Sequence, residues 1–215
     1  MAGWTVEDAL ADGRAEVRLR AALDTGARPE ARYVGVLVAR CAVEPAFEVR
    51  EVLTWAITRH PAEATVPLLM AEVRSGGAQA RSQALHTLSK IGDPRGWEVI
   101  TAKVLADADD EVARSAWRAA TALVPDGEKG RLATELTAQL GRGGHDTRRS
   151  LSRALVALGD MILPSLRHAA AHADPDVRAH ALATERLLAD PEAGFASLIE
   201  EAKRAVALHG RGPGG

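Results

Sequence analysis

The feature that most constrains this chain is an internal repeat of about 30–35 residues. Five segments share a pattern of small, apolar and basic residues: 49–60 (VREVLTWAITRH), 80–93 (ARSQALHTLSKIGD), 112–127 (VARSAWRAATALVPDG), 147–160 (TRRSLSRALVALGD) and 177–190 (VRAHALATERLLAD). A weaker copy starts at Arg18, within VRLRAALDTG. A unit this short cannot bury its apolar face alone, so the copies are expected to stack against one another.

Each copy forms one amphipathic helix when the copies are aligned on a single position, the anchor. The anchors are Arg18, Arg50, Arg81, Ala113, Arg148 and Arg178. Apolar residues follow three, seven and ten positions later, as in Ala84, Leu88 and Ile91, and this spacing lies on one helix face. The sixth position carries a small residue in the five clear copies: Ala56, Thr87, Ala119, Ala154 and Thr184. Small side chains at one register predict a line along which neighbouring helices approach closely.

A second apolar helix is expected after each of these first helices. The expected ranges are 29–42, 62–74, 94–106, 128–140, 161–172 and 191–208. Pro94 and Pro191 each follow an aspartate, which pairs a capping residue with proline in the first helical turn. The short connections imply antiparallel helix pairs. The pairs define repeats near 14–42, 46–74, 78–106, 109–140, 145–172 and 174–208.

Composition indicates an all-α chain of ordinary charge. Aromatic residues make up 3% of it, and strand-favouring residues do not alternate with polar ones between hairpin turns. The formal net charge of -2 argues against a protein that coats nucleic acid or anionic membrane by bulk charge. Cys41 is the single cysteine, so an intramolecular disulfide and a thiolate zinc cluster are excluded.

The sequence also carries expectations about location. No apolar run approaches the roughly 18 residues of a membrane span, and the N-terminal stretch MAGWTVEDALADG is acidic and lacks the apolar core of a signal peptide. A cytoplasmic protein with no membrane contact is therefore expected. Residues 210–215, rich in glycine, are expected to form a disordered tail.

With these motifs the chain resembles the HEAT-repeat family, particularly its short bacterial form, over about residues 45–190. The resemblance lies in the acidic-to-arginine starts of two copies (Asp176 to Arg178 and Glu48 to Arg50), the following Ala-Leu pairs, and the Gly-Asp turns at 92–93 and 159–160. It implies a right-handed α-α superhelix, a HEAT-type solenoid of about six helix pairs, filling residues 1–209 as one domain. It also implies that the acid and arginine of Glu48/Arg50, Asp146/Arg148 and Asp176/Arg178 form a ladder between adjacent repeats. Function does not follow from it, because this fold serves many unrelated partners.

A metal site is one functional alternative. His168 and His172 lie four residues apart on an expected helix and share a face, which supplies half of a zinc-like ligand set. A third ligand would have to be Asp174, His180 or His145. The HEAT-repeat di-iron hydroxylase uses His-Glu pairs as ligands, and no His-Glu dipeptide occurs in this sequence. No metal or other cofactor is expected, and metal-dependent chemistry at the two histidines stays open as an alternative.

The four tryptophans raise a second alternative. Trp117 lies at a core position of its copy, Trp55 at a partly buried one, Trp97 opens a second helix, and Trp4 is expected to cover the first helix pair. Bacterial DNA glycosylases of HEAT-like architecture hold DNA with tryptophans beside an aspartate. Trp55 and Trp97, with Asp93 or Asp109, are the nearest counterparts here. Mixed charges on the expected second helices disfavour nucleic acid as the ligand.

The favoured hypothesis is a non-catalytic interaction module or scaffold that binds a protein partner through its concave, second-helix surface. No nucleophile elbow, phosphate-binding glycine loop or Cys–His signature is present, so no catalytic residue is assigned. Mixed charges would set specificity, and exposed aromatic residues would dominate the binding energy. The expected partner-binding residues are Tyr33, Arg32, Glu72, Arg95, Trp97, Lys103, Arg131 and Arg167.

Overall fold

The computed structural model describes residues 5–209. Helices make up 78% of the structure, and no strand occurs within the described residues, so the prediction of an all-α fold is confirmed. None of the helices between residues 5 and 209 is long and apolar enough to cross a membrane. Contacts divide the chain into two compact units, Met1–Val104 and Leu105–Gly215.

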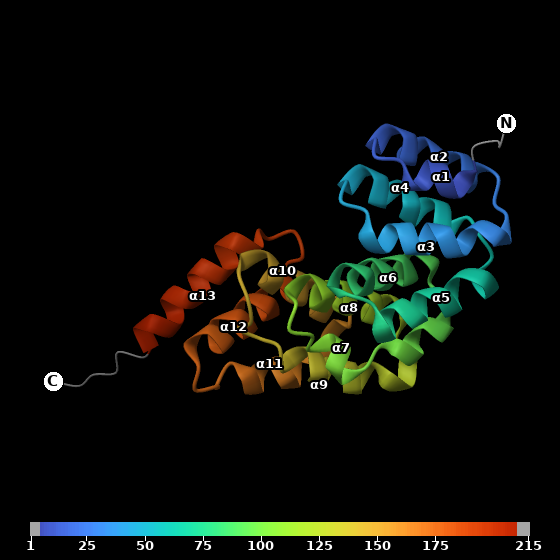
Figure 1. Ribbon diagram of the computed structural model, residues 1–215. Helices are drawn as coiled ribbons and strands as arrows, with labels where there is room; N and C mark the ends of the chain where they lie inside the picture. The colour runs from blue at the N-terminus through green and yellow to red at the C-terminus, as the bar shows by residue number, and fades with distance from the viewer. Residues whose placement is uncertain (1–4, 210–215) are drawn as a thin grey trace. The chain divides into compact units, whose positions relative to one another are not determined.

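The first unit holds the helices labelled α1 to α6 in Figure 1. Their bounds are α1 Val6–Ala11, α2 Ala15–Ala27, α3 Val34–Val43, α4 Phe47–Thr58, α5 Ala62–Ser75 and α6 Ala78–Ile91, with 3-10 helices at Ala31–Tyr33 and Pro94–Val99. α7 (Ala102–Leu105) follows and reaches the unit boundary. Within the unit the first helices pack in chain order, α2 on α4 and α4 on α6, while α3 packs on α5.

The second unit repeats the arrangement (Figure 1). Its helices are α8 Asp110–Leu123, α9 Lys129–Thr137, α10 His145–Val156, α11 Leu163–Ala169, α12 Pro175–Ala189 and α13 Phe195–His209, with 3-10 helices at Asp126–Glu128 and Gly159–Ile162. The first helices again pack in order, α8 on α10 and α10 on α12, and the second helices α9 and α11 are in contact. The five first helices expected from the clear copies are thus α4, α6, α8, α10 and α12.

Three elements differ from expectation. The helix expected over 191–208 is α13, which begins at Phe195, so Pro191 lies in the turn before it and not in a first helical turn. The second helix expected over 94–106 is a 3-10 helix, Pro94–Val99, followed by the short α7. The β-branched run of Val99, Ile100 and Thr101 disfavours a continuous helix, and the Thr101 hydroxyl accepts the amide of Val104 to start the new turn. The helix α1 was not expected, although its N-terminus carries a capping box in which the side chains of Thr5 and Asp8 each accept the other's backbone N–H.

The small residues six positions after the anchor are buried in every clear copy, as the line of close approach requires. They are Ala56, Thr87, Ala119, Ala154 and Thr184. The two threonine hydroxyls donate to carbonyls one turn earlier, those of Gln83 and His180, so their burial leaves no hydroxyl donor unsatisfied. Residues three positions after the anchor, such as Leu53 and Leu151, are buried as well.

The anchor arginines all form the same kind of hydrogen bond. Each donates to backbone carbonyls five to seven residues upstream, in the connection that precedes its helix: Arg18 to Asp12 (2.9 Å), Arg50 to Glu44 and Pro45 (2.9 and 2.8 Å), Arg81 to Gly76 (3.0 Å), Arg148 to Gly143 and Gly141 (3.0 and 2.8 Å), Arg178 to His172 and Ala173 (both 2.7 Å). A connection between helices leaves carbonyls without helical partners, and a guanidinium offers five N–H donors to them. The arginines therefore fasten each connection to the helix that follows it.

The expected ladder is present at one rung. Arg148 of α10 pairs with Asp176 of α12 at 3.1 Å, which joins adjacent first helices. Arg50 and Arg178 instead use their guanidinium groups on carbonyls, and within residues 5–209 Glu48 forms no ion pair. Among the expected pairs the ladder is therefore limited to Arg148 and Asp176.

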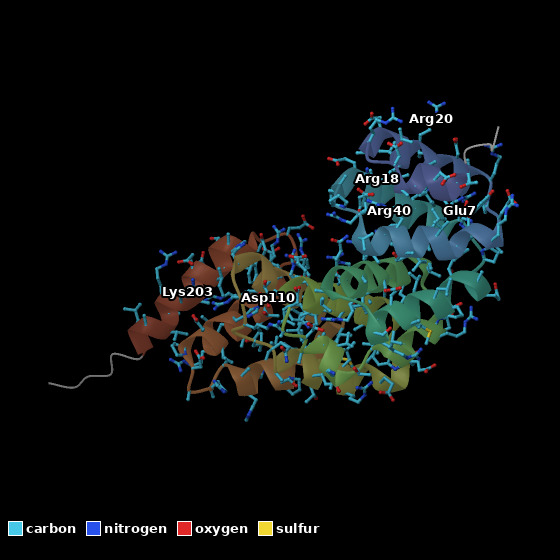
Figure 2. The ribbon with its side chains drawn as sticks, in the orientation of Figure 1. Glu7, Arg18, Arg20, Arg40, Asp110 and Lys203 are labelled. Carbon is cyan, nitrogen blue, oxygen red and sulfur yellow. The ribbon has the colours of Figure 1, made fainter. Side chains whose placement is uncertain are left out.

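The copy whose anchor is Ala113 receives a guanidinium from the connection that follows α9. Arg142, in the connection between α9 and α10, donates to the carbonyl of Asp107 and pairs with Asp110 at 2.8 Å; Asp110 is labelled in Figure 2. Asp107 precedes Ala113 by the same six positions that separate Arg18 from Asp12. The Arg142 guanidinium also lies 5.9 Å from the centre of the Trp117 ring.

We therefore expect Arg142→Met to destabilise the protein by about 2 kcal/mol, because hydrogen bonds from a charged donor are lost. Arg142→Lys should lose less, because an ammonium group still donates to the same acceptors. Urea unfolding followed by circular dichroism measures both effects. Arg149→Met, which removes an arginine without a partner in the described residues, is the control and should change little; an equal loss in the two methionine variants would contradict the assigned role of Arg142.

Candidate functional site

Buried charged groups are candidates for catalytic residues, because burial can shift their pKa values. In the first unit the Glu44 carboxylate is fully buried and accepts from Arg18 at 2.6 and 2.7 Å, from Arg40 at 2.7 Å and from the Ala46 amide at 2.9 Å. Figure 2 labels both arginines, which come from α2 and α3. Burial alone would raise the pKa of the Glu44 carboxyl, but these hydrogen bonds outweigh it and hold the pKa at about 2. A carboxylate engaged by this many donors serves structure, since little of it is left to act as a base.

The second unit contains a serine and a histidine in hydrogen-bond contact, which is the arrangement of a nucleophile and its base. Ser152 Oγ lies 3.0 Å from His180 Nε2 and 2.7 Å from Thr184 Oγ1, and all three side chains are buried. The Gly141 amide donates to His180 Nδ1 at 3.0 Å. The cluster ties the connection between α9 and α10 to α12.

Hydrogen bonding decides what this histidine can do. Because Nδ1 accepts from the Gly141 amide, the neutral ring carries its proton on Nε2, which faces the Arg148 carbonyl at 3.0 Å. Nε2 therefore donates and cannot take a proton from Ser152. Burial lowers the pKa of His180 to about 4, so the ring stays neutral at pH 7.

The same hydrogen bonds remove His180 from the metal hypothesis, since both of its ring nitrogens are occupied. Among residues 5–209, no three His, Cys, Asp or Glu side chains lie close enough together to hold a metal ion. His172 Nδ1 accepts the amide of Asp174 at 3.0 Å, which closes the turn before α12. His168 is exposed on α11.

His168 and His172 instead line a cavity of about 470 Å³ on the second-helix side of this unit. The cavity, here called the second-helix groove, lies between α9 and α11 and reaches the first turn of α12. Its lining is mostly small or apolar and is made of Thr134, Thr137, Ala138, Leu140, Pro164, Ser165, His168, Ala169, His172 and Val177. The groove is therefore shaped for an apolar group with a few hydrogen-bonding partners at its margin.

The expected partner-binding residues fall in both units. Arg131 and Arg167 belong to the second unit, and the others belong to the first. Arg32 and Tyr33 are brought together, with the guanidinium 4.8 Å from the ring centre. Glu72 and Trp97 are half-buried, and Lys103 is exposed.

Most of the expected basic residues already hold a carboxylate of the chain. The pairs are Arg32 with Glu30 (2.8 Å), Arg95 with Asp93 (2.6 Å), Arg131 with Glu128 and Glu135 (2.6 and 2.7 Å) and Arg167 with Glu185 (3.9 Å). A partner would have to compete with these neighbours. Exposed pairs of this kind contribute little stability, so they can open on binding at small cost.

The tryptophans have distinct environments. Trp117 is completely buried and donates from Nε1 to the Leu105 carbonyl at 2.9 Å, which confirms it as a core residue. Trp55 is 41% exposed, and one side of its ring packs against Gly26 of α2, where an added Cβ would lie 2.3 Å from the ring. Trp4, expected to cover the first helix pair, and the expected tail 210–215 lie outside the described residues.

The aspartates named beside the tryptophans have structural partners. Hydrogen bonds from the Arg95 side chain and amide lower the pKa of Asp93 to about 2. Asp109 caps α8 by accepting the amides of Glu111 and Val112 at 2.9 and 3.2 Å. Both carboxylates are thus used for local structure, which weakens the analogy with a glycosylase site.

A basic cleft on the first helices of the second unit was not predicted from the sequence. Arg114 and Arg118 of α8 and Arg149 and Arg153 of α10 line a cavity of about 410 Å³. The positions of these arginines in the repeat could have predicted the cleft. The arginines occupy the first and fifth positions after the anchor in two consecutive copies, and equal positions of stacked helices lie side by side.

The neutral state of His180 leads to a pH prediction. Its folded pKa of about 4 lies below the ordinary value of 6.5, so the stabilisation is complete above pH 6.5 and is lost as the pH falls toward 4. Between pH 7 and pH 5 the free energy of unfolding should fall by about 2 kcal/mol through this residue. His180→Asn should flatten the urea-unfolding profile over that range, and exposed His168→Gln should not. A wild-type slope in His180→Asn would show that another group controls it.

No protein-family model matches this chain, and no well-characterised protein is significantly similar to it in sequence.

Proposed function

We propose that this protein is a non-catalytic interaction module of the HEAT-repeat type, a right-handed α-α superhelix of about six helix pairs. Its concave, second-helix surface binds a protein partner. The repeated burial of small residues at one register supports the solenoid, because every first helix then offers its successor the same close-packing face. The ordered packing of α2, α4 and α6 in one unit and of α8, α10 and α12 in the other is consistent with it.

The observation that carries the proposal is the second-helix groove. Its apolar lining includes Leu140, Ala169 and Val177. The Thr137 hydroxyl, which donates to the Ala133 carbonyl, can accept a hydrogen bond from a ligand, and the ring of His168 is exposed beside it. Stable protein interfaces combine an apolar centre with a polar rim, and a few deeply seated side chains dominate their energy. An apolar side chain of a partner, such as leucine or phenylalanine, fits this groove best.

The expected basic residues of this unit lie beside the groove. Arg131 precedes the lining residue Thr134 by three positions on α9, and Arg167 follows the lining residue Pro164 by three on α11, so each shares a helix face with the lining. Both are exposed. Acidic residues flanking the partner's apolar side chain would exchange with Glu128, Glu135 and Glu185 as counterions and would favour one orientation.

The buried polar groups support binding over catalysis. The serine and histidine in contact, Ser152 and His180, are locked in a tautomer that cannot activate the hydroxyl. The Glu44 carboxylate is held by two arginines and an amide. Both clusters fasten connections to helices, which gives a preformed surface that loses little conformational freedom on binding.

Filling the groove should weaken partner binding. Ala138 and Ala157 are exposed alanines in the same helical conformation at the ends of α9 and α10, and Ala138 lines the groove whereas Ala157 does not. Ala138→Arg and Ala157→Arg are therefore a matched pair. Immobilised wild type, both variants and a blank support would be incubated with extract of the source cells, and retained proteins would be quantified by mass spectrometry.

A protein retained by wild type and by Ala157→Arg should be reduced about tenfold by Ala138→Arg, equivalent to the loss of one well-seated apolar side chain. Circular dichroism and unfolding midpoints establish that both variants fold. Recovery of the same proteins in the same amounts by all three baits would overturn the proposal.

A further inference from the structure

The basic cleft between α8 and α10, here called the first-helix groove, has the strongest concentration of like charge among the described cavities. Its lining consists of Arg114, Arg118, Thr121, Asp146, Arg149, Ser150, Arg153 and Ala154. The arginines of each helix are four residues apart, so both point from the same helix face into the cleft. This concentration stands out in a chain whose formal net charge is -2.

Two of the four guanidinium groups are available to a ligand. Arg149 and Arg153 are exposed, and within residues 5–209 neither forms an ion pair or a hydrogen bond. Arg114 pairs with Glu111 at 2.6 Å, and its buried Nε has no acceptor among the described residues. The carboxylate of Asp146 lies 3.4 Å from His145. The groove therefore holds an excess of positive charge that repels itself until an anion enters.

The spacing of the arginines matches an extended peptide. Four residues of an α-helix advance about 6 Å, and side chains on one face of an extended chain recur about every 6.6 Å. Packed helices lie about 8–10 Å apart, so a strand between α8 and α10 would have a row of guanidinium groups on each side. Carboxylates at alternate positions of such a strand could each meet an arginine in bidentate geometry.

A cavity of mixed lining adjoins this groove. Arg149 and Arg153 also line this second cavity of about 540 Å³, which has apolar walls at Val156, Leu187 and Pro191 and a carboxylate at Glu192. Because the two cavities share these arginines, one ligand can occupy both. A peptide with an acidic run followed by an apolar residue would place its carboxylates in the first-helix groove and its apolar side chain in the adjoining cavity.

Nucleic acid fits less well. Non-specific binding of single strands relies on aromatic side chains that stack with bases, and none lines the first-helix groove. Phe195, in the adjoining cavity, is only 5% exposed and packs against the ring of His180.

We infer that the first-helix groove is a second binding site, distinct from the second-helix groove, for an extended acidic peptide segment of a protein. Arg149 and Arg153 receive alternate carboxylates, assisted by Arg114 and Arg118. An apolar residue next to the acidic run enters the cavity beside Leu187. The site does not depend on the function proposed for the second helices.

The direct test is fluorescence anisotropy with a labelled short peptide that carries glutamate at alternate positions and a terminal leucine. A lysine version of the peptide and an oligothymidylate of similar length are the other probes. The groove variant is Arg149→Ser with Arg153→Ser. Its control is Arg20→Ser with Arg59→Ser, which removes the same charge from exposed arginines of the first unit; Figure 2 shows Arg20 projecting away from α2.

Wild type and the control should bind the acidic peptide equally, and the groove variant should bind it at least about tenfold more weakly. Raising the salt concentration should weaken binding, since exposed charges are screened within about 10 Å at 0.1 M salt. Ala138→Arg should bind the peptide as wild type does, which separates this site from the second-helix groove. Equal affinities of the groove and control variants, tighter binding of oligothymidylate than of the peptide, or no peptide binding by wild type at low salt would each overturn the inference.

Discussion

The contact between an arginine guanidinium and the carbonyl groups of the preceding connection is the interaction on which the arrangement of the first helices depends. A turn between antiparallel helices leaves carbonyls without helical partners, and leaving them unsatisfied in a packed structure is costly. Arg18, Arg50, Arg81, Arg148 and Arg178 each supply the missing donors. Once the connections are held in this way, successive first helices meet at the same register.

That common register determines both the interior and the surface. Six positions after the anchor, alanine or threonine is buried where helices approach. In α8 and α10 the first and fifth positions carry arginines that line the same cleft. The first-helix groove thus follows from the packing of α8 on α10 at a common register.

The parts of the fold that could be predicted are those that every copy repeats. Positions such as Leu53 and Leu151 face the core for the same reason in each copy, so their period identified the first helices. The second helices vary more, and the break at Ile100 reflects local β-branched residues that a repeat average conceals. For the candidate site, Asp93 could have been recognised from the sequence as a partner of Arg95, since the two are close in the chain. The second-helix groove could not be foreseen, because a cavity depends on how α9 and α11 pack.

Arg142 links two turns that the sequence repeat alone would treat as independent. The turn before α8 is held by Arg142 of the connection that follows α9, through Asp107 and Asp110. Recombination that deletes, duplicates or transplants a single repeat is tolerated when each repeat is self-sufficient. Here a cut directly after α9 would separate Arg142 from the turn it secures, so residues 107–142 are the smallest segment that keeps this contact.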